Sequence, residues 1–222
     1  PLIVATMIRP VVGVYAVTLL TLVGDEAVAG WYPFAKNFWS PESISYVSDA
    51  LTITPIDLML GVTVLAWLLQ SYGRHTWTFR RGALGVPMLI FGALVLFALA
   101  RATVGVGDTR IAIFEGRAML YLPVLYVLIV QLVQTRKQFR VLFAVAFSGV
   151  LLHSLLALNY YSGLPGPERS ELERLTEHSA SIHIAALVII LFSTLVIPGC
   201  TSRLRLLALV AAVPTSWVFV LS

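Results

Sequence analysis

The sequence predicts an all-α membrane protein, a polytopic bundle of about seven transmembrane helices with its N-terminus in the cytoplasm. Three observations predict this class. Hydrophobic residues make up 59% of the 222 residues and charged residues only 12%, against about 25% charged in an average soluble domain. The apolar residues fall into runs close to the roughly 20 residues with which a helix crosses a bilayer. Charged residues lie almost entirely between these runs.

The expected spans follow from these runs. They are residues 2–23, 52–70, 83–100, 118–134, 141–158, 181–198 and 206–222. Inside hydrocarbon each span must satisfy its own backbone hydrogen bonds, which favours helices, and the sequence lacks the alternation of a lipid-facing β-barrel. Arg9-Pro10 interrupts the first span. That span is therefore either the tail of one helix or a short helix beginning at Val11.

The second span begins with a helix-start signal. In Thr54-Pro55-Ile56-Asp57, threonine is suited to the N-cap, proline to the first helical position, and aspartate to the third. The pattern predicts a capping box, in which the Asp57 carboxylate also interacts favourably with the helix dipole. The alternative is a functional acid inside the membrane.

The charges of the connections predict the orientation. Asp and Glu are absent from the connections that hold Arg74, Arg80 and Arg81, then residues 136–140, then Arg203 and Arg205. The other connections, residues 24–51, 101–117 and 159–180, carry ten of the eleven acids. By the positive-inside rule the first set is cytoplasmic. The second set faces outward, and because the inner connections are short, we expect function on the outer face of a bacterial cytoplasmic membrane.

We expect residues 1–222 to form a single membrane domain. The start at Pro1 rather than Met and the apolar last residues, 217–222, predict a fragment of a longer protein. The single cysteine, Cys200, excludes an internal disulfide and a cysteine-based zinc site. The histidines and carboxylates lack metal-ligand spacing. We therefore expect neither a metal nor another cofactor.

The second outer connection, residues 101–117, is the most informative. It holds Arg101, Arg110 and Arg117 together with two acids, Asp108 and Glu115. The planar guanidinium fork of arginine matches paired phosphate oxygens. The cluster, partly neutralised by the two acids, predicts a site for a lipid-linked diphosphate. The alternative is that these side chains snorkel to lipid phosphates and form local ion pairs.

The third outer connection adds further candidates. Arg174 and His178 are i,i+4 neighbours on an expected short polar helix, a pattern that is also typical of an ordinary solvated helix face. His183 and His153 are expected near the same membrane face. Histidines in membrane helices often only form hydrogen bonds between helices.

A longer pattern resembles a known family. Residues 107–117 have the form Gly-Asp-x-x-x-Ala-x-x-Glu-x-Arg, and residues 120–126 continue as Leu-Tyr-Leu-Pro-x-Leu-Tyr. An inner turn, residues 135–140, and an outward stretch with Arg174 and residues 178–183 follow. Over roughly residues 50–222 this order is similar to the O-antigen ligase and O-antigen polymerase family.

The resemblance implies a metal-independent glycosyltransferase of cell-surface polysaccharide synthesis. Such an enzyme moves a glycan from a polyprenyl diphosphate to an acceptor glycan or glycolipid on the outer face of the membrane. Arg101, Arg110, Arg117 and Arg174 would hold the diphosphate, with Asp108 and Glu115 in support, and His178 would be the base. Nothing in the charge pattern indicates nucleic acid as a partner. The family's second large outer loop is missing from these 222 residues.

Two other functions stay open. The near absence of charges inside the spans is also typical of a non-enzymatic membrane subunit or scaffold. A transporter is the third alternative. Transporters often have broken helices and intramembrane charges, and here Arg9-Pro10 is the sequence feature that indicates a break.

Overall fold

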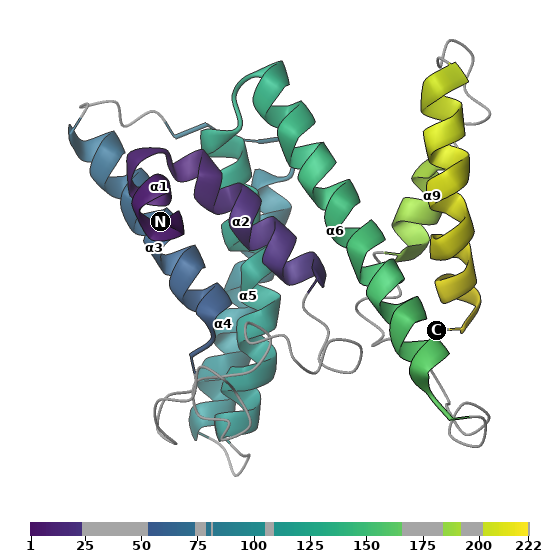
Figure 1. Ribbon diagram of the computed structural model, residues 1–222. Coiled ribbons are helices and arrows are strands. Elements are labelled where there is room, and N and C mark those ends of the chain that lie inside the picture. The colour runs from purple at the N-terminus through teal and green to yellow at the C-terminus, as the bar shows by residue number, and fades with distance from the viewer. Residues whose placement is uncertain are drawn as a thin grey trace. The chain divides into compact units, whose positions relative to one another are not determined.

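The computed structural model describes residues 1–23, 53–73, 79–80, 82–104, 109–165, 184–191 and 202–221, and the regular elements among them are all α-helices (Figure 1). The class predicted from the sequence is therefore confirmed as all-α within these ranges. Asp108, Arg174 and His178 lie outside the described residues, as do His183 and Cys200.

The helices follow the expected runs along the chain. Residues 184–191 form a further helical stretch. The labelled helices are α1 (Leu2–Ile8), α2 (Pro10–Val23), α3 (Pro55–Gly73), α4 (Gly85–Val104), α5 (Thr109–Leu132), α6 (Arg136–Gly163) and α9 (Ser202–Leu221).

Within the described ranges, three helical segments are long and apolar enough to cross a membrane. They are Pro55–Gly73, Gly85–Ala102 and Arg136–Gly163. Shorter apolar helical segments lie at Pro10–Val23, Met119–Leu132 and Arg205–Val220. The described part of the chain therefore holds three candidate transmembrane helices. The total of seven spans and the cytoplasmic N-terminus stay predictions.

The first expected span is two helices. Arg9 separates α1 from α2 and has an extended backbone, with φ −138° and ψ 92°. Proline disfavours helical geometry in the residue before it, which explains why the helix ends at this position. The side-chain amide of Gln70 in α3 donates hydrogen bonds to the carbonyls of Met7 (3.1 Å) and Ile8 (2.9 Å) at the end of α1. The break is thus partly capped by a neighbouring helix.

Close packing at a glycine joins α2 to α1 and α3. Gly13 is buried, and so are Thr6 and Thr63. A β-carbon at position 13 would overlap the Thr63 hydroxyl and lie 2.6 Å from Cγ2 of Thr6. Glycine therefore allows these backbones to approach each other, as small residues do between membrane helices.

The predicted capping box at the start of α3 is confirmed. The Thr54 backbone N–H and hydroxyl donate to Oδ2 of Asp57 at 2.7 and 2.8 Å, and the Asp57 backbone N–H donates to the Thr54 hydroxyl at 3.1 Å. Asp57 is half-buried, and its Oδ2 accepts two of these bonds.

Several helices extend beyond the apolar runs that predicted them. We expected residues 101–117 as a connection, but α4 continues to Val104 and α5 begins at Thr109. Likewise α6 spans Arg136–Gly163 instead of residues 141–158. The length of an apolar run reflects only the part of a helix that lies inside the hydrocarbon core of the bilayer. A helix continues past it where long polar side chains reach the interface.

The chain divides into two compact units, one of Pro1–Tyr15 with Leu58–Arg140 and the other of Ala16–Asp57 with Val141–Ser222. The core of the second unit brings together α6, residues 184–191 and α9. Alanines contribute four of its nine buried residues, which is typical of closely packed membrane helices. These core residues are Val150, Ala157, Ile184, Leu187, Leu191, Ala208, Ala211, Ala212 and Val218.

Candidate functional site

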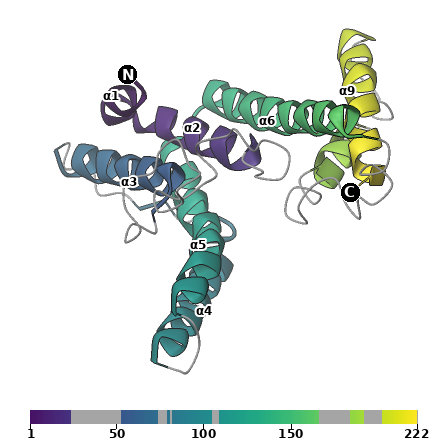
Figure 2. The ribbon, with the colours of Figure 1, turned by 60° about the horizontal axis from the view of Figure 1, so that its bottom comes forward.

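Helices α4 and α5 form an antiparallel hairpin in the first unit and lie side by side in both views (Figures 1 and 2). Gly92 of α4 faces Pro123 of α5, where a β-carbon on the glycine would lie 3.6 Å from the proline ring. Nearer the other end, a β-carbon on Gly116 would lie 2.5 Å from Cδ2 of Leu99. These two contacts fix the register of the hairpin.

The register places the backbones of two predicted site residues within about one helical turn of each other along the hairpin. Arg101 follows Leu99 by two residues and is exposed in the last turn of α4. Arg117 directly follows Gly116 in α5. Because Leu99 and Gly116 are in contact, the arginines at 101 and 117 belong to the same end of the hairpin, although they lie on different helices.

Of the other predicted residues of this cluster, some lie in the described helices and others do not. Arg110 is the second residue of α5 and Glu115 lies in its second turn. Arg110 and Arg117 are seven residues apart, so their backbones are separated by about 10 Å along the axis of α5. Asp108 lies outside the described residues, as do Arg174 and His178. Their approach to the hairpin stays a prediction.

An anion site at this end of the hairpin stays a prediction. The chain carries an arginine there on each of two helices, at positions 101 and 117. Arg101 lies at the C-terminal end of α4, where a cation is favoured by the helix dipole. Arginine is suited to bidentate contacts with phosphate groups, so the predicted chemistry is binding of phosphate groups.

The histidines predicted near the same face are only partly described. His153 lies on α6, is 2% exposed and belongs to the second unit. The neighbouring Ser154 donates its hydroxyl to the Val150 carbonyl at 2.9 Å. His178 and His183 fall outside the described residues. Their convergence with His153 stays a prediction.

The opposite end of the hairpin is fixed by side chains of α5. Gln131 accepts a hydrogen bond from the Arg80 backbone N–H (3.2 Å) and donates one to the Arg80 carbonyl (3.0 Å). The Tyr126 hydroxyl accepts a hydrogen bond from the Leu84 backbone N–H at 2.9 Å. A β-carbon on Gly82 would overlap that hydroxyl. The segment before α4 is thus held against α5 at two points.

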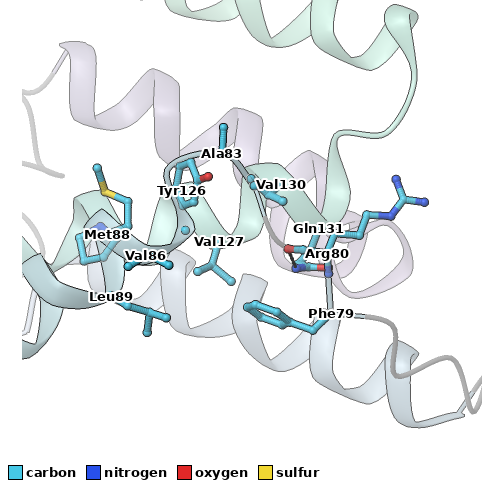
Figure 3. A pocket seen from close by; sticks show the side chains of 13 residues that line it. Phe79, Arg80, Ala83, Val86, Met88, Leu89, Tyr126, Val127, Val130 and Gln131 are labelled. Carbon is cyan, nitrogen blue, oxygen red and sulfur yellow. Dashed lines mark hydrogen bonds between the residues drawn. The ribbon is translucent and has the colours of Figure 1, made fainter.

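A cavity of about 520 Å³ lies between this segment, the start of α4 and the second half of α5. Its volume is within the range of about 300–1,000 Å³ for small-molecule sites. Figure 3 shows the lining, which is mostly apolar. The residues are Phe79, Arg80, Gly82, Ala83, Gly85, Val86, Met88, Leu89, Pro123, Tyr126, Val127, Val130 and Gln131.

The sequence did not predict this cavity. We expected function on the outer face because the connections with Arg and Lys alone are short, yet this cavity lies at the end of the hairpin beside one of them. Its walls come mostly from two helices, with a short segment before α4, so the length of a connection does not predict it. The available signal was Tyr126 and Gln131, two hydrogen-bonding side chains within residues 122–133, which are otherwise apolar.

Comparison of the chain with models of protein families, with curated proteins and with solved structures gave no match.

Proposed function

We propose that this protein is a membrane glycosyltransferase that moves a glycan from a polyprenyl-diphosphate carrier to an acceptor sugar on the outer face of the membrane. The observation that carries the proposal is the contact between Leu99 and Gly116. It brings the backbones of Arg101 and Arg117 within about one helical turn of each other near the end of the α4–α5 hairpin. The resemblance of residues 107–126 to the O-antigen ligase and polymerase family supports the same function.

The proposed reaction depends on stabilising the negative charge that develops on the diphosphate, and no cofactor takes part in it. The acceptor hydroxyl oxygen attacks the anomeric carbon of the first sugar, and the bond from that carbon to the diphosphate oxygen breaks. The diphosphate leaves with the bonding electron pair, so negative charge develops where arginines can stabilise it. A base takes the proton of the acceptor hydroxyl. His178 is the candidate base in this proposal, with Arg110 and Arg174 as further diphosphate ligands.

Lipid binding tests the first step. The protein in nanodiscs is titrated with polyprenyl diphosphate, and polyprenyl monophosphate of the same chain length serves as the reference ligand. We expect Arg101→Ala and Arg117→Ala each to weaken diphosphate binding about tenfold or more, since a hydrogen bond to a charged group contributes about 1.5–3 kcal/mol. Lysine at these positions should restore binding only partly, because it lacks the bidentate fork.

The matched control is Arg136→Ala. Arg136 is exposed at the start of α6, beside the inner turn of the predicted topology, and should leave diphosphate binding unchanged. Transfer is then measured as release of polyprenyl diphosphate from a lipid-linked glycan in membranes. Arg117→Ala and Arg174→Ala should abolish release while the protein remains inserted. Near-normal release in both variants would overturn the proposal.

A second function, that of a non-enzymatic membrane subunit, is favoured by one observation. Helix α4 is exposed over most of its apolar surface, with Val95 as its buried hydrophobic residue in the described structure. Such a helix has to be covered by lipid or by the helices of a partner. This function predicts that lysine replaces Arg101 and Arg117 without loss, and that the protein purifies with stoichiometric partners. The lysine variants therefore separate the two functions.

A further inference from the structure

The cavity beside Arg80 has a polar edge and an apolar interior. Figure 3 shows the Arg80 main chain beside Gln131, while its guanidinium extends away from Val127 and Leu89. Arg80 is exposed. The inner walls are formed by aliphatic side chains of α4 and α5. A ligand that matches this cavity therefore has an anionic group at one end and an apolar chain at the other.

We propose that this cavity binds an anionic phospholipid, with the headgroup phosphate on Arg80 and part of an acyl chain between α4 and α5. The positive charge around the cavity favours an anionic ligand. Arg74, Arg80 and Arg81 belong to a connection with no acidic residue. In the predicted orientation this connection faces the cytoplasmic leaflet, whose anionic lipids attract basic segments next to the membrane. Basic pockets between membrane helices on that side are suited to lipid headgroups.

The apolar wall is continuous with a surface that lipid would cover. Val86 and Leu89 line the cavity, yet they are 68% and 71% exposed. These side chains lie on α4, one of the three candidate transmembrane helices. An acyl chain can therefore enter from the bilayer without leaving hydrocarbon.

The main chain of Arg80 is fixed before any lipid binds. Gln131 holds both the N–H and the carbonyl of Arg80, and Tyr126 holds the start of α4 through Leu84. A site that is already formed loses less conformational entropy on binding. Gln131 is a positioning residue in this proposal, since it acts through the main chain of Arg80. The site lies at the opposite end of the hairpin from Arg101 and Arg117, so it is independent of the proposed transfer reaction.

Native mass spectrometry of the whole chain tests the headgroup contact. The probes are dioleoyl phosphatidylglycerol and dioleoyl phosphatidylcholine, which share their acyl chains. We expect more phosphatidylglycerol than phosphatidylcholine to be retained. Arg80→Gln should reduce retention of phosphatidylglycerol about fivefold, the effect of one basic residue near an anionic surface. Lys137→Gln is the control, because Lys137 is exposed at the same predicted membrane face and lines none of the described cavities.

A second pair of variants tests the acyl chain. Val127→Trp fills the cavity and should reduce retention of phosphatidylglycerol, whereas Leu96→Trp alters an exposed position of α4 outside the cavity and should not. If Val127→Trp fails to fold, fluorescence quenching by brominated lipids tests the acyl chain instead. Cys200→Ser/Val86→Cys is labelled with a fluorophore, which brominated phosphatidylglycerol should quench more strongly than brominated phosphatidylcholine. Equal losses from Arg80→Gln and Lys137→Gln, or equal quenching by both lipids, would overturn the proposal.

Discussion

The side-chain amide of Gln131 pairs with the main chain of Arg80 through two hydrogen bonds, although the residues are 51 positions apart in the chain. Gln131 is 5% exposed, so it is a buried polar side chain whose donor and acceptor are both used. The contact holds the non-helical segment around Arg80 against α5, and this segment forms one wall of the cavity.

The first prediction concerns Gln131 itself. Gln131→Leu removes both hydrogen bonds and leaves two backbone groups of Arg80 without their partner. Because one hydrogen bond contributes about 0.5–1.5 kcal/mol to stability, loss of both should lower the free energy of unfolding by about 1–3 kcal/mol. The measurement is unfolding in detergent by heat or denaturant. Gln134→Leu is the control, because Gln134 is exposed and its side-chain amide donates to the Gln131 carbonyl instead. Equal losses in both variants would contradict the assigned role.

The second prediction compares two glycines. Gly13→Ala should destabilise the protein by about 1–3 kcal/mol, since the added methyl group overlaps Thr63 and crowds Thr6. Gly61→Ala should be neutral or stabilising by up to about 1 kcal/mol. Apart from its chain neighbours and the backbone of α3, no described atom lies within 4 Å of the added β-carbon, and alanine is the better helix former. Thermal unfolding of the two variants gives the comparison. Thr63→Ala should partly rescue Gly13→Ala. Equal stability of the two glycine variants would show that α2 does not approach α3 this closely.

The third prediction separates a cap from a functional acid. Thr54→Ala and Asp57→Ala each remove hydrogen bonds of the same capping box, so each should lower the free energy of unfolding by about 1 kcal/mol. The double variant should cost little more than either one, because the residues act together. Polyprenyl diphosphate binding should be unchanged in all three. A loss of binding in Asp57→Ala alone would instead favour an intramembrane functional role.

The fourth prediction tests orientation. Cys200, the single cysteine, is replaced by serine, and one new cysteine is placed at Lys137 or at Pro165, both exposed and at opposite ends of α6. In intact cells a membrane-impermeant thiol reagent should label Pro165→Cys. Lys137→Cys should be labelled only after the membrane is opened, because basic connections remain in the cytoplasm. The reverse pattern would also move Arg101 and Arg117 to the cytoplasmic side and overturn the proposed function.

The sequence by itself determined the helical class and several helix starts. The start of α3 at Pro55 and the break at Arg9-Pro10 follow from interactions over three or four residues, which a linear pattern records directly. Apolar runs located the helices, but they marked only the hydrocarbon. As a result, α4 and α5 extend into residues 101–117, where we expected a connection.

The tertiary structure alone decided which helix faces meet. The capping of α1 by Gln70, the approach of Gly13 to Thr63 and the two bonds from Gln131 to Arg80 all join residues at least 50 positions apart. In a membrane helix nearly every face is apolar, so hydropathy does not tell a lipid-facing side from a protein-facing side. Steric fit at small residues and the need to pair each buried polar group make that choice, and both depend on side chains brought together only by folding.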